Sequence, residues 1–451
     1  MGKLKQNQIY KMIKWFVLSS LIGAIVGGVD AAFLKTLDAT ISWRNQFPWY
    51  FMGLPIFLYV IYLLARKVSP KNLDYSTDDV IDKINTYQTV SWVSAVKALA
   101  LSLLTIGAGG SAGKEAPGAD AGAGISSCLA QLFRMDAEDR HKLMICGVSA
   151  GFAGVFGVPI SGAIFGLEVL WVGHIFYEVM FPALIAGITS FQVTTYLGVN
   201  YIYHPMHFEP VISEQFFLKV VVAGVLFGLV AILFAEILKL MKVVFRYISV
   251  RTSPFWRSFI GGVLLVLVGL FISPLYLGLG MDGINEVLAG GALASPLGFL
   301  IKTFTTGITF AAGGVGGTIT PIFFVGAQAG AAISGWLGTD SATMAALGLV
   351  AVLAGAANTP LAASIMAIEL FGAAIAPYAT VACVISFLIT GRNSIYPSQR
   401  ISFDKQRDVP VLDSRHARRM AARKGLMLKT FKDMSRHLIP NPKGFDNRKD
   451  K

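Results

Sequence analysis

The chain has 451 residues, of which 54% are hydrophobic and 14% charged, and its mean hydropathy is +0.62. Soluble globular domains carry roughly 25% charged residues, so this composition excludes an ordinary soluble protein and predicts an all-α polytopic membrane protein. The net charge of +12 does not indicate a nucleic-acid partner, because the basic residues gather beside apolar segments near the two ends of the chain.

The chain begins with a basic segment, residues 1–12, and ends with a short basic tail, residues 401–451. Basic residues that flank membrane segments lie preferentially on the cytoplasmic side. We therefore expect both termini to face the cytoplasm, with the chain embedded in the inner membrane of a prokaryote. Between the termini, the sequence predicts a first membrane repeat at 13–205 and a second at 206–400.

Apolar runs occur in both of these halves. A membrane-spanning helix takes about 17–25 predominantly apolar residues. Runs of that length lie at 15–34, 51–68, 216–238 and 259–280. They make the lipid bilayer the expected environment of the chain.

The three cysteines are Cys128, Cys146 and Cys383. They lie in apolar surroundings without the spacing of metal ligands, so we expect small core residues. No metal and no cofactor is expected.

Two blocks of the first half recur in the second half. The segment 105–125 matches 309–333, and the segment 147–169 matches 348–370. The matched pairs include Thr105 with Thr309, Gly113 with Gly317, Gly147 with Gly348, and Glu168 with Glu369. Two blocks in the same order at nearly equal spacing indicate an internal duplication, as in many transporters. Glu168 is expected to be structural, because its counterpart Glu369 occupies the same place.

Each block contains a proline that predicts the start of a helix. Proline is tolerated in a first turn because its missing N–H group would be unpaired there. The four prolines are Pro117, Pro159, Pro321 and Pro360. A helix that begins at membrane depth directs free N–H groups and the positive end of its dipole at one point, which is suited to an anion. Two such starts from two repeats predict a central anion site.

The sequence GGSAGKEAPGADAG, residues 109–122, combines glycines with Lys114 and Glu115. A phosphate-binding loop would need a hydroxyl residue after the lysine, and Glu115 stands there instead. An ionisable residue inside a membrane costs about 2.5–3.5 kcal/mol even on insertion scales and usually has a function. We expect Glu115 to occupy the anion site when ionised and to leave it when protonated, so that it acts as a gate and a proton acceptor.

These motifs resemble those of the CLC family of anion channels and proton-coupled anion exchangers, as a prokaryotic-type member without regulatory domains. GKEAP at 113–117 resembles the family element that carries the gating glutamate, and GTITP at 317–321 resembles the element whose amides line the pathway. The segment 157–168 resembles the helix that leads to the subunit interface. The resemblance implies two inverted-topology repeats with broken helices that meet at the bilayer midplane, and a homodimer with one pore in each subunit. It implies an anion site formed by Lys114, Ala116, Thr318, Ile319, Tyr396 and Ser76.

Two departures from the family pattern bear on the mechanism. The segment 71–84 lacks the first family motif, whose serine contacts the anion, so Ser76 or Thr77 is expected to supply that hydroxyl. Val169 stands where proton-coupled relatives have an internal glutamate, and valine cannot carry a proton.

The resemblance therefore predicts transport of a small inorganic anion, with chloride the first choice and a channel-like mechanism. A fluoride/proton antiporter of the same family is the alternative, because that branch also alters these two places. An intramembrane enzyme is a distant alternative, since it would need paired catalytic groups at membrane depth. The expected partners are halide ions, protons, the lipid bilayer and a second copy of the chain.

Overall fold

The computed structural model describes residues 2–68, 77–204, 213–291 and 295–402. Sixteen α-helices make up most of the described chain, which confirms the predicted all-α class. Residues 1–400 form one compact unit. The boundary predicted at 205/206 lies outside the described residues, as does nearly all of the tail from residue 401.

The elements of the first half run from α1 to α8. Their bounds are α1 (Gly2–Arg44), η1 (Tyr50–Gly53), α2 (Leu54–Val68), α3 (Thr77–Asn85), α4 (Trp92–Gly107), α5 (Glu115–Leu132), α6 (Ala137–Phe156), α7 (Pro159–Glu168), β1 (Trp171–Val172) and α8 (Tyr177–Tyr196).

The elements of the second half follow the same order. Their bounds are α9 (Glu214–Arg251), α10 (Pro254–Phe271), η2 (Pro274–Tyr276), α11 (Met281–Leu288), α12 (Gly298–Ala311), α13 (Ile319–Leu337), α14 (Ser341–Ala357), α15 (Pro360–Phe371), η3 (Ala373–Ile375), α16 (Ala376–Thr390) and β2 (Arg400–Ile401).

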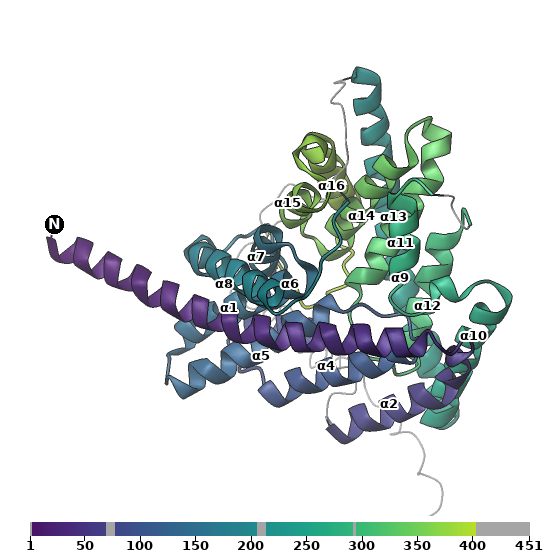
Figure 1. The fold of residues 1–451 in the computed structure, drawn as a ribbon, viewed down its shortest axis with the longest axis horizontal. Coiled ribbons are helices and arrows are strands. Elements are labelled where there is room, and N and C mark those ends of the chain that lie inside the picture. The colour runs from purple at the N-terminus through teal and green to yellow at the C-terminus, as the bar shows by residue number, and fades with distance from the viewer. Residues whose placement is uncertain (1, 69–76, 205–212, 292–294, 403–451) are drawn as a thin grey trace, which may run out of the picture. The chain divides into compact units, whose positions relative to one another are not determined.

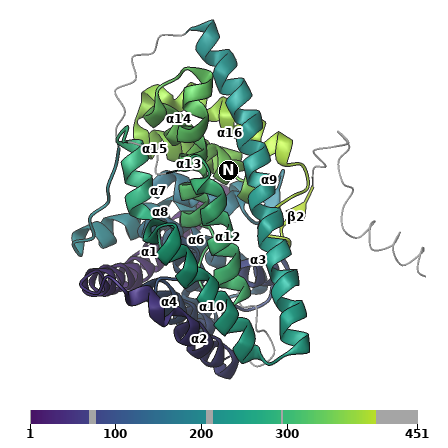
Figure 2. The same cartoon turned by 90° about the vertical axis from the view of Figure 1, so that its right-hand side faces the viewer.

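The helices of the two halves make equivalent packing contacts. The long helix α1 lies against α8, α6 and α4 (Figure 1). Its counterpart α9 lies against α16, α14 and α12 (Figure 2). Each contact of the first half therefore has an equivalent in the second half, as expected of a duplicated unit.

Seven helical segments within the described residues are long and apolar enough to cross a membrane. They are Gln8–Arg44, Tyr50–Lys67, Tyr177–Tyr196, Glu214–Val250, Pro254–Phe271, Ile319–Leu337 and Ala373–Thr390. This number supports a polytopic membrane protein, and the other helices fill the space between these segments.

Glycines set the distance between the central helices of each half. A Cβ atom on Gly122 of α5 would lie 1.9 Å from the carbonyl oxygen of Gly147 in α6. In the second half, a Cβ atom on Gly326 of α13 would lie 2.3 Å from the carbonyl oxygen of Gly348 in α14. Small residues allow helix backbones to approach closely where lipid offers no hydrophobic driving force. The glycines thus serve as close-packing positions.

Hydrogen bonds between the halves are reciprocal. The Thr309 hydroxyl accepts a bond of 3.0 Å from the Ser111 amide, and the Thr105 hydroxyl accepts one of 3.0 Å from the Val315 amide. Thr105 and Thr309 are a pair matched in the sequence repeat. The two inverted repeats therefore meet around a local two-fold axis.

Glu168 and Glu369 form equivalent hydrogen bonds across the two halves at two other helix starts. The Glu168 carboxylate accepts bonds of 3.1 and 2.9 Å from the first-turn amides of Leu361 and Ala362 in α15. The Glu369 carboxylate accepts bonds of 2.8 Å from the Ile160 amide and of 2.8 Å from the next amide in α7. Each glutamate caps the helix of the other repeat.

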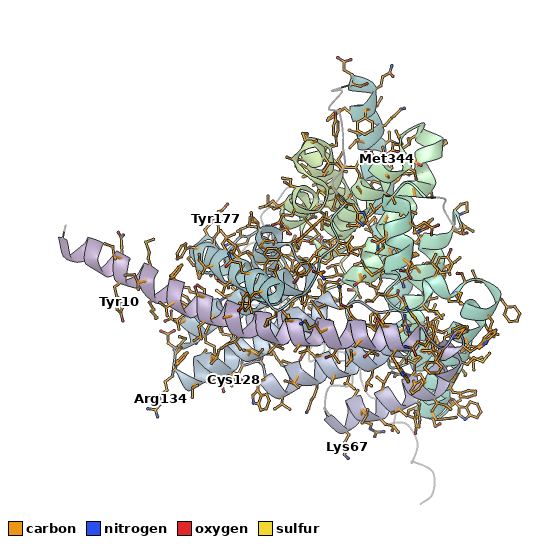
Figure 3. The ribbon with its side chains drawn as sticks, in the orientation of Figure 1. Tyr10, Lys67, Cys128, Arg134, Tyr177 and Met344 are labelled. Carbon is orange, nitrogen blue, oxygen red and sulfur yellow. The ribbon has the colours of Figure 1, made fainter. Side chains whose placement is uncertain are left out.

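The cysteines follow the expectation only in part. Cys146 and Cys383 are buried, whereas Cys128 is exposed on α5 (Figure 3). All three are free thiols. The prediction that Cys128 is a core residue is wrong, because its position on α5 is exposed although the neighbouring Ser126 and Ser127 are buried.

Candidate functional site

The two glycine-rich loops meet in the interior of the protein. Gly113 and Gly317 form an isolated antiparallel bridge, in which the Gly113 amide donates to the Gly317 carbonyl at 2.6 Å and the reverse bond measures 2.9 Å. This bridge brings the starts of α5 and α13 together. The residues before these helices, Lys114 and Thr318, adopt nearly the same backbone conformation, with φ of −98° and −97°.

Glu115 is the first residue of α5 and is fully buried. Its Oε2 atom accepts a bond of 2.5 Å from the Thr320 hydroxyl and one of 3.2 Å from the Thr320 amide. Its Oε1 atom has no partner among the described residues. The carboxylate therefore lies at the N-terminal end of α13, where first-turn amides and the helix dipole attract an anion.

A cavity of about 670 Å³ reaches the site from one side. Its lining includes Arg44, Lys114, Tyr201 and Phe323, and we call it the Arg44 cavity. The Lys114 amide lies 3.4 Å from the Thr320 hydroxyl oxygen. Lys114 and Glu115 form no ion pair, so the lysine contributes positive potential to the cavity wall.

A second cavity, of about 680 Å³, contains Thr318 and Tyr396 in its lining, and we call it the Thr318 cavity. The two cavities share no lining residue. Glu115 lines neither of them, although its neighbour Lys114 lines the first and Thr318 lines the second. Glu115 therefore lies between residues that line the two cavities.

The Tyr396 side chain is 4% exposed, and its hydroxyl lies near the Thr318 side chain without a hydrogen bond of normal geometry. A buried hydroxyl that lacks a partner is a costly feature unless a ligand or water uses it.

The loop that presents Tyr396 is held on both sides. Asp78 of α3 accepts bonds of 2.8 Å from the amide and of 2.8 Å from the hydroxyl of Ser398. Gln399 donates bonds of 2.8 and 2.7 Å to the carbonyls of Val169 and Ala357. These anchors position the tyrosine relative to both repeats.

Known proteins show the same architecture. The sequence profile of the family described as "Voltage gated chloride channel" matches residues 57–391. A "Chloride/fluoride channel protein" of Pseudomonas syringae pv. tomato is 35% identical over 401 residues, which is 87% of this chain and 87% of that protein. The chain belongs to the CLC family.

Further relatives support this assignment. The "Voltage-gated ClC-type chloride channel ClcB" of Escherichia coli is 29% identical over 319 residues, which cover 67% of this chain and 74% of the relative. A solved structure described as a "CLC-type fluoride/proton antiporter" aligns with a TM-score of 0.81 at 28% identity, over 87% of this chain and 99% of that one. A slow cyanobacterial Cl⁻/H⁺ antiporter has the same fold, with a TM-score of 0.73 at 19% identity, over 83% and 94% of the two chains.

The structure brings most of the predicted CLC site residues together. Lys114 and Glu115 face the start of α13, and the side chain of Ala116 lies against Gly317. Thr318 precedes α13, and Ile319 is its buried first residue. Ser76 lies outside the described residues. Its alternative, Thr77, begins α3 and lines the Thr318 cavity.

Val169 lies apart from this CLC site. It is buried in the core and does not line the Thr318 cavity. A proton that enters from that cavity therefore finds no carboxylate at position 169, whichever anion is transported.

Two residues were missed in the sequence. Thr320, which holds Glu115, lies within the GTITP motif, but the motif does not reveal that its hydroxyl crosses to the other repeat. Asp120 is a second buried acid on α5. The cost of an acid in a membrane helix, which singled out Glu115, applies equally to Asp120 and could have identified it.

Proposed function

We propose that this CLC protein exchanges fluoride for protons, with Glu115 as the gate that both ions move. The observation that carries the proposal is the placement of the Glu115 carboxylate on the α13 start between two separate cavities. The structure described as a fluoride/proton antiporter favours fluoride over chloride, the first choice from the sequence. The relative described as a chloride/fluoride channel names both ions.

The chemistry of the site suits a small anion. Fluoride concentrates its charge and needs strong donors when it loses water. The Thr320 hydroxyl and amide point at the place now taken by the carboxylate, and the Tyr396 hydroxyl is free to donate nearby. An anion that displaces ionised Glu115 would inherit these donors.

Exchange follows from the competition at this site. Ionised Glu115 closes the path because it occupies the anion position. Protonation removes its charge, weakens its hold on the α13 start and lets an anion enter from either cavity. A proton and an anion therefore pass the same residue in alternation, which couples their movements.

A passive chloride channel is the second candidate. It is favoured by Val169, which removes the carboxylate that proton-coupled relatives use at this position. The two candidates differ in one measurable property, since a channel cannot drive protons uphill.

The test uses purified protein in liposomes loaded with fluoride or chloride. A fluoride-selective electrode follows efflux while an internal dye follows pH. The proposal predicts that an outward fluoride gradient drives protons inward against their gradient, and that Glu115→Gln passes fluoride without moving protons. Fluoride or chloride efflux from the unmodified protein with no uphill proton movement would establish the channel instead.

We further propose a homodimer with both termini in the cytoplasm. Apolar side chains on α7 and α15, Ile160 and Leu361, are 46% and 41% exposed. The family resemblance implies that the segment 157–168, which contains Ile160, leads to the subunit interface, and Leu361 belongs to the equivalent helix of the second repeat. The molar mass in detergent should equal two chains, and a value of one chain would contradict the dimer.

A further inference from the structure

Helix α5 carries a second buried acid, Asp120, which is 4% exposed. Its Oδ2 atom accepts a bond of 3.2 Å from the Thr77 hydroxyl of α3. Its Oδ1 atom is buried and has no partner among the described residues. A carboxylate in this state is expensive at membrane depth, and packing alone would favour an apolar residue.

The side of Asp120 toward α3 leads to the Thr318 cavity. Thr77, its hydrogen-bond partner, lines that cavity. Asp79 and Lys83 of α3 interact electrostatically with Asp120, and they pair with each other at 2.6 Å. The other charged residues of the cavity wall are Asp78, Asp82, Lys239, Lys242 and Arg257. The Thr77 side chain is therefore the link between this cavity and Asp120.

The other side of Asp120 leads to the gate. Tyr396 lines the same cavity as Thr77, together with Thr318, which precedes the helix that holds Glu115. The acids that interact electrostatically with its hydroxyl are Asp120, Glu115 and Asp78 of α3. Among these groups, Asp78 is engaged by Ser398. Unused oxygen atoms remain on Asp120, on Glu115 and on the tyrosine itself.

Other buried acids do not fit this place. Both oxygen atoms of Glu168 are occupied by the amides of α15. Asp30 of α1 also lacks partners, but its oxygen atoms face Gly118 and Gly154. Unlike Asp120, it accepts no hydrogen bond from a residue that lines either cavity.

We propose that Asp120 is the internal proton carrier, which passes protons between the Thr318 cavity and Glu115. The inference rests on the proposed exchange of fluoride for protons. A proton leaves water in the cavity and binds Oδ1 of Asp120. It then reaches Oε1 of Glu115 by way of the Tyr396 hydroxyl, which accepts one proton as it donates its own. Water has to bridge the gaps in this path, because no hydrogen bond joins these three groups directly. Asp120 returns to the carboxylate and Glu115 becomes neutral, so that no charge is left over.

The test compares variants in fluoride-loaded liposomes with simultaneous recording of fluoride and internal pH. Asp120→Asn should keep fluoride efflux but lose uphill proton movement. Asp120→Ser should give the same result; its smaller side chain removes the acid without crowding α3. The matched control is Asp82→Asn, the same change at an exposed residue of the Thr318 cavity wall, and it should retain the unmodified proton-to-fluoride ratio.

The outcomes separate the inference from the proposed function. If either Asp120 variant pumps protons at the unmodified ratio, Asp120 is not the carrier, whereas the exchange mechanism stands. If the unmodified protein itself moves no protons uphill, the proposed exchange and the role of Asp120 fail together. If neither Asp120 variant reaches the membrane in folded form while Asp82→Asn does, the acid is structural and the inference is overturned.

Discussion

Glu115 receives two hydrogen bonds from one residue of the other repeat, through the hydroxyl and the amide of Thr320. A hydrogen bond to a charged group contributes about 1.5–3 kcal/mol. In the proposed mechanism these two bonds hold the ionised carboxylate firmly enough to close the site, while an anion or a proton can still release it. Its free Oε1 atom is the position at which a proton can arrive.

Thr320→Val tests this hold on the gate. Valine has nearly the same shape and lacks the hydroxyl, so the carboxylate should leave the α13 start more easily. We expect fluoride flux at neutral pH to rise by roughly tenfold, which corresponds to the loss of about 1.4 kcal/mol. Thr320→Ser keeps the hydroxyl and should behave like the unmodified protein. Unchanged flux in the valine variant would show that the hydroxyl does not hold the gate closed, and reduced flux would show that its bond to fluoride outweighs its bond to Glu115.

The sequence could identify Glu115 because a charged residue in an apolar chain is conspicuous. It could not identify Thr320 as its partner, because that contact depends on how the two repeats face each other. The role of Tyr396 rested on resemblance alone, and its unpartnered hydroxyl became visible only in the folded chain.

Helix starts organise the protein at the scale of its elements. Helices α7 and α15 begin at Pro159 and Pro360, as predicted. Helices α5 and α13 begin before Pro117 and Pro321, so each proline lies within the first turn. This small difference matters, because it places Glu115 inside α5 and not in the preceding loop.

Glu168→Ala tests the reciprocal capping of these helices. It leaves the amides of Leu361 and Ala362 without their acceptors in a buried place. An unsatisfied buried group costs about 1–3 kcal/mol, so we expect a melting temperature in detergent that is several degrees lower. Glu286→Ala, at an exposed position of α11, serves as the control. Equal melting temperatures for the two variants would contradict a structural role for Glu168.

The whole molecule combines two equivalent halves with one asymmetric site. The bridge between Gly113 and Gly317 follows the symmetry of the repeat, and so do the equivalent hydrogen bonds that Thr105 and Thr309 accept. The functional side chains do not follow this symmetry, because Glu115 and Asp120 belong to the first repeat and Thr320 belongs to the second. The duplication was readable in the sequence as matched blocks. The two cavities were not, because their walls combine residues from many distant segments.

Coupled exchange must work in both directions, and this reciprocity gives the most direct measurement. Liposomes with equal fluoride inside and outside are given a proton gradient, acidic outside, with the membrane potential clamped. If fluoride and protons exchange through the Glu115 site, fluoride should leave the liposomes against its own growing gradient, and Glu115→Gln should abolish this movement. If the proton gradient moves no fluoride although the protein conducts it, the proposed exchange is contradicted.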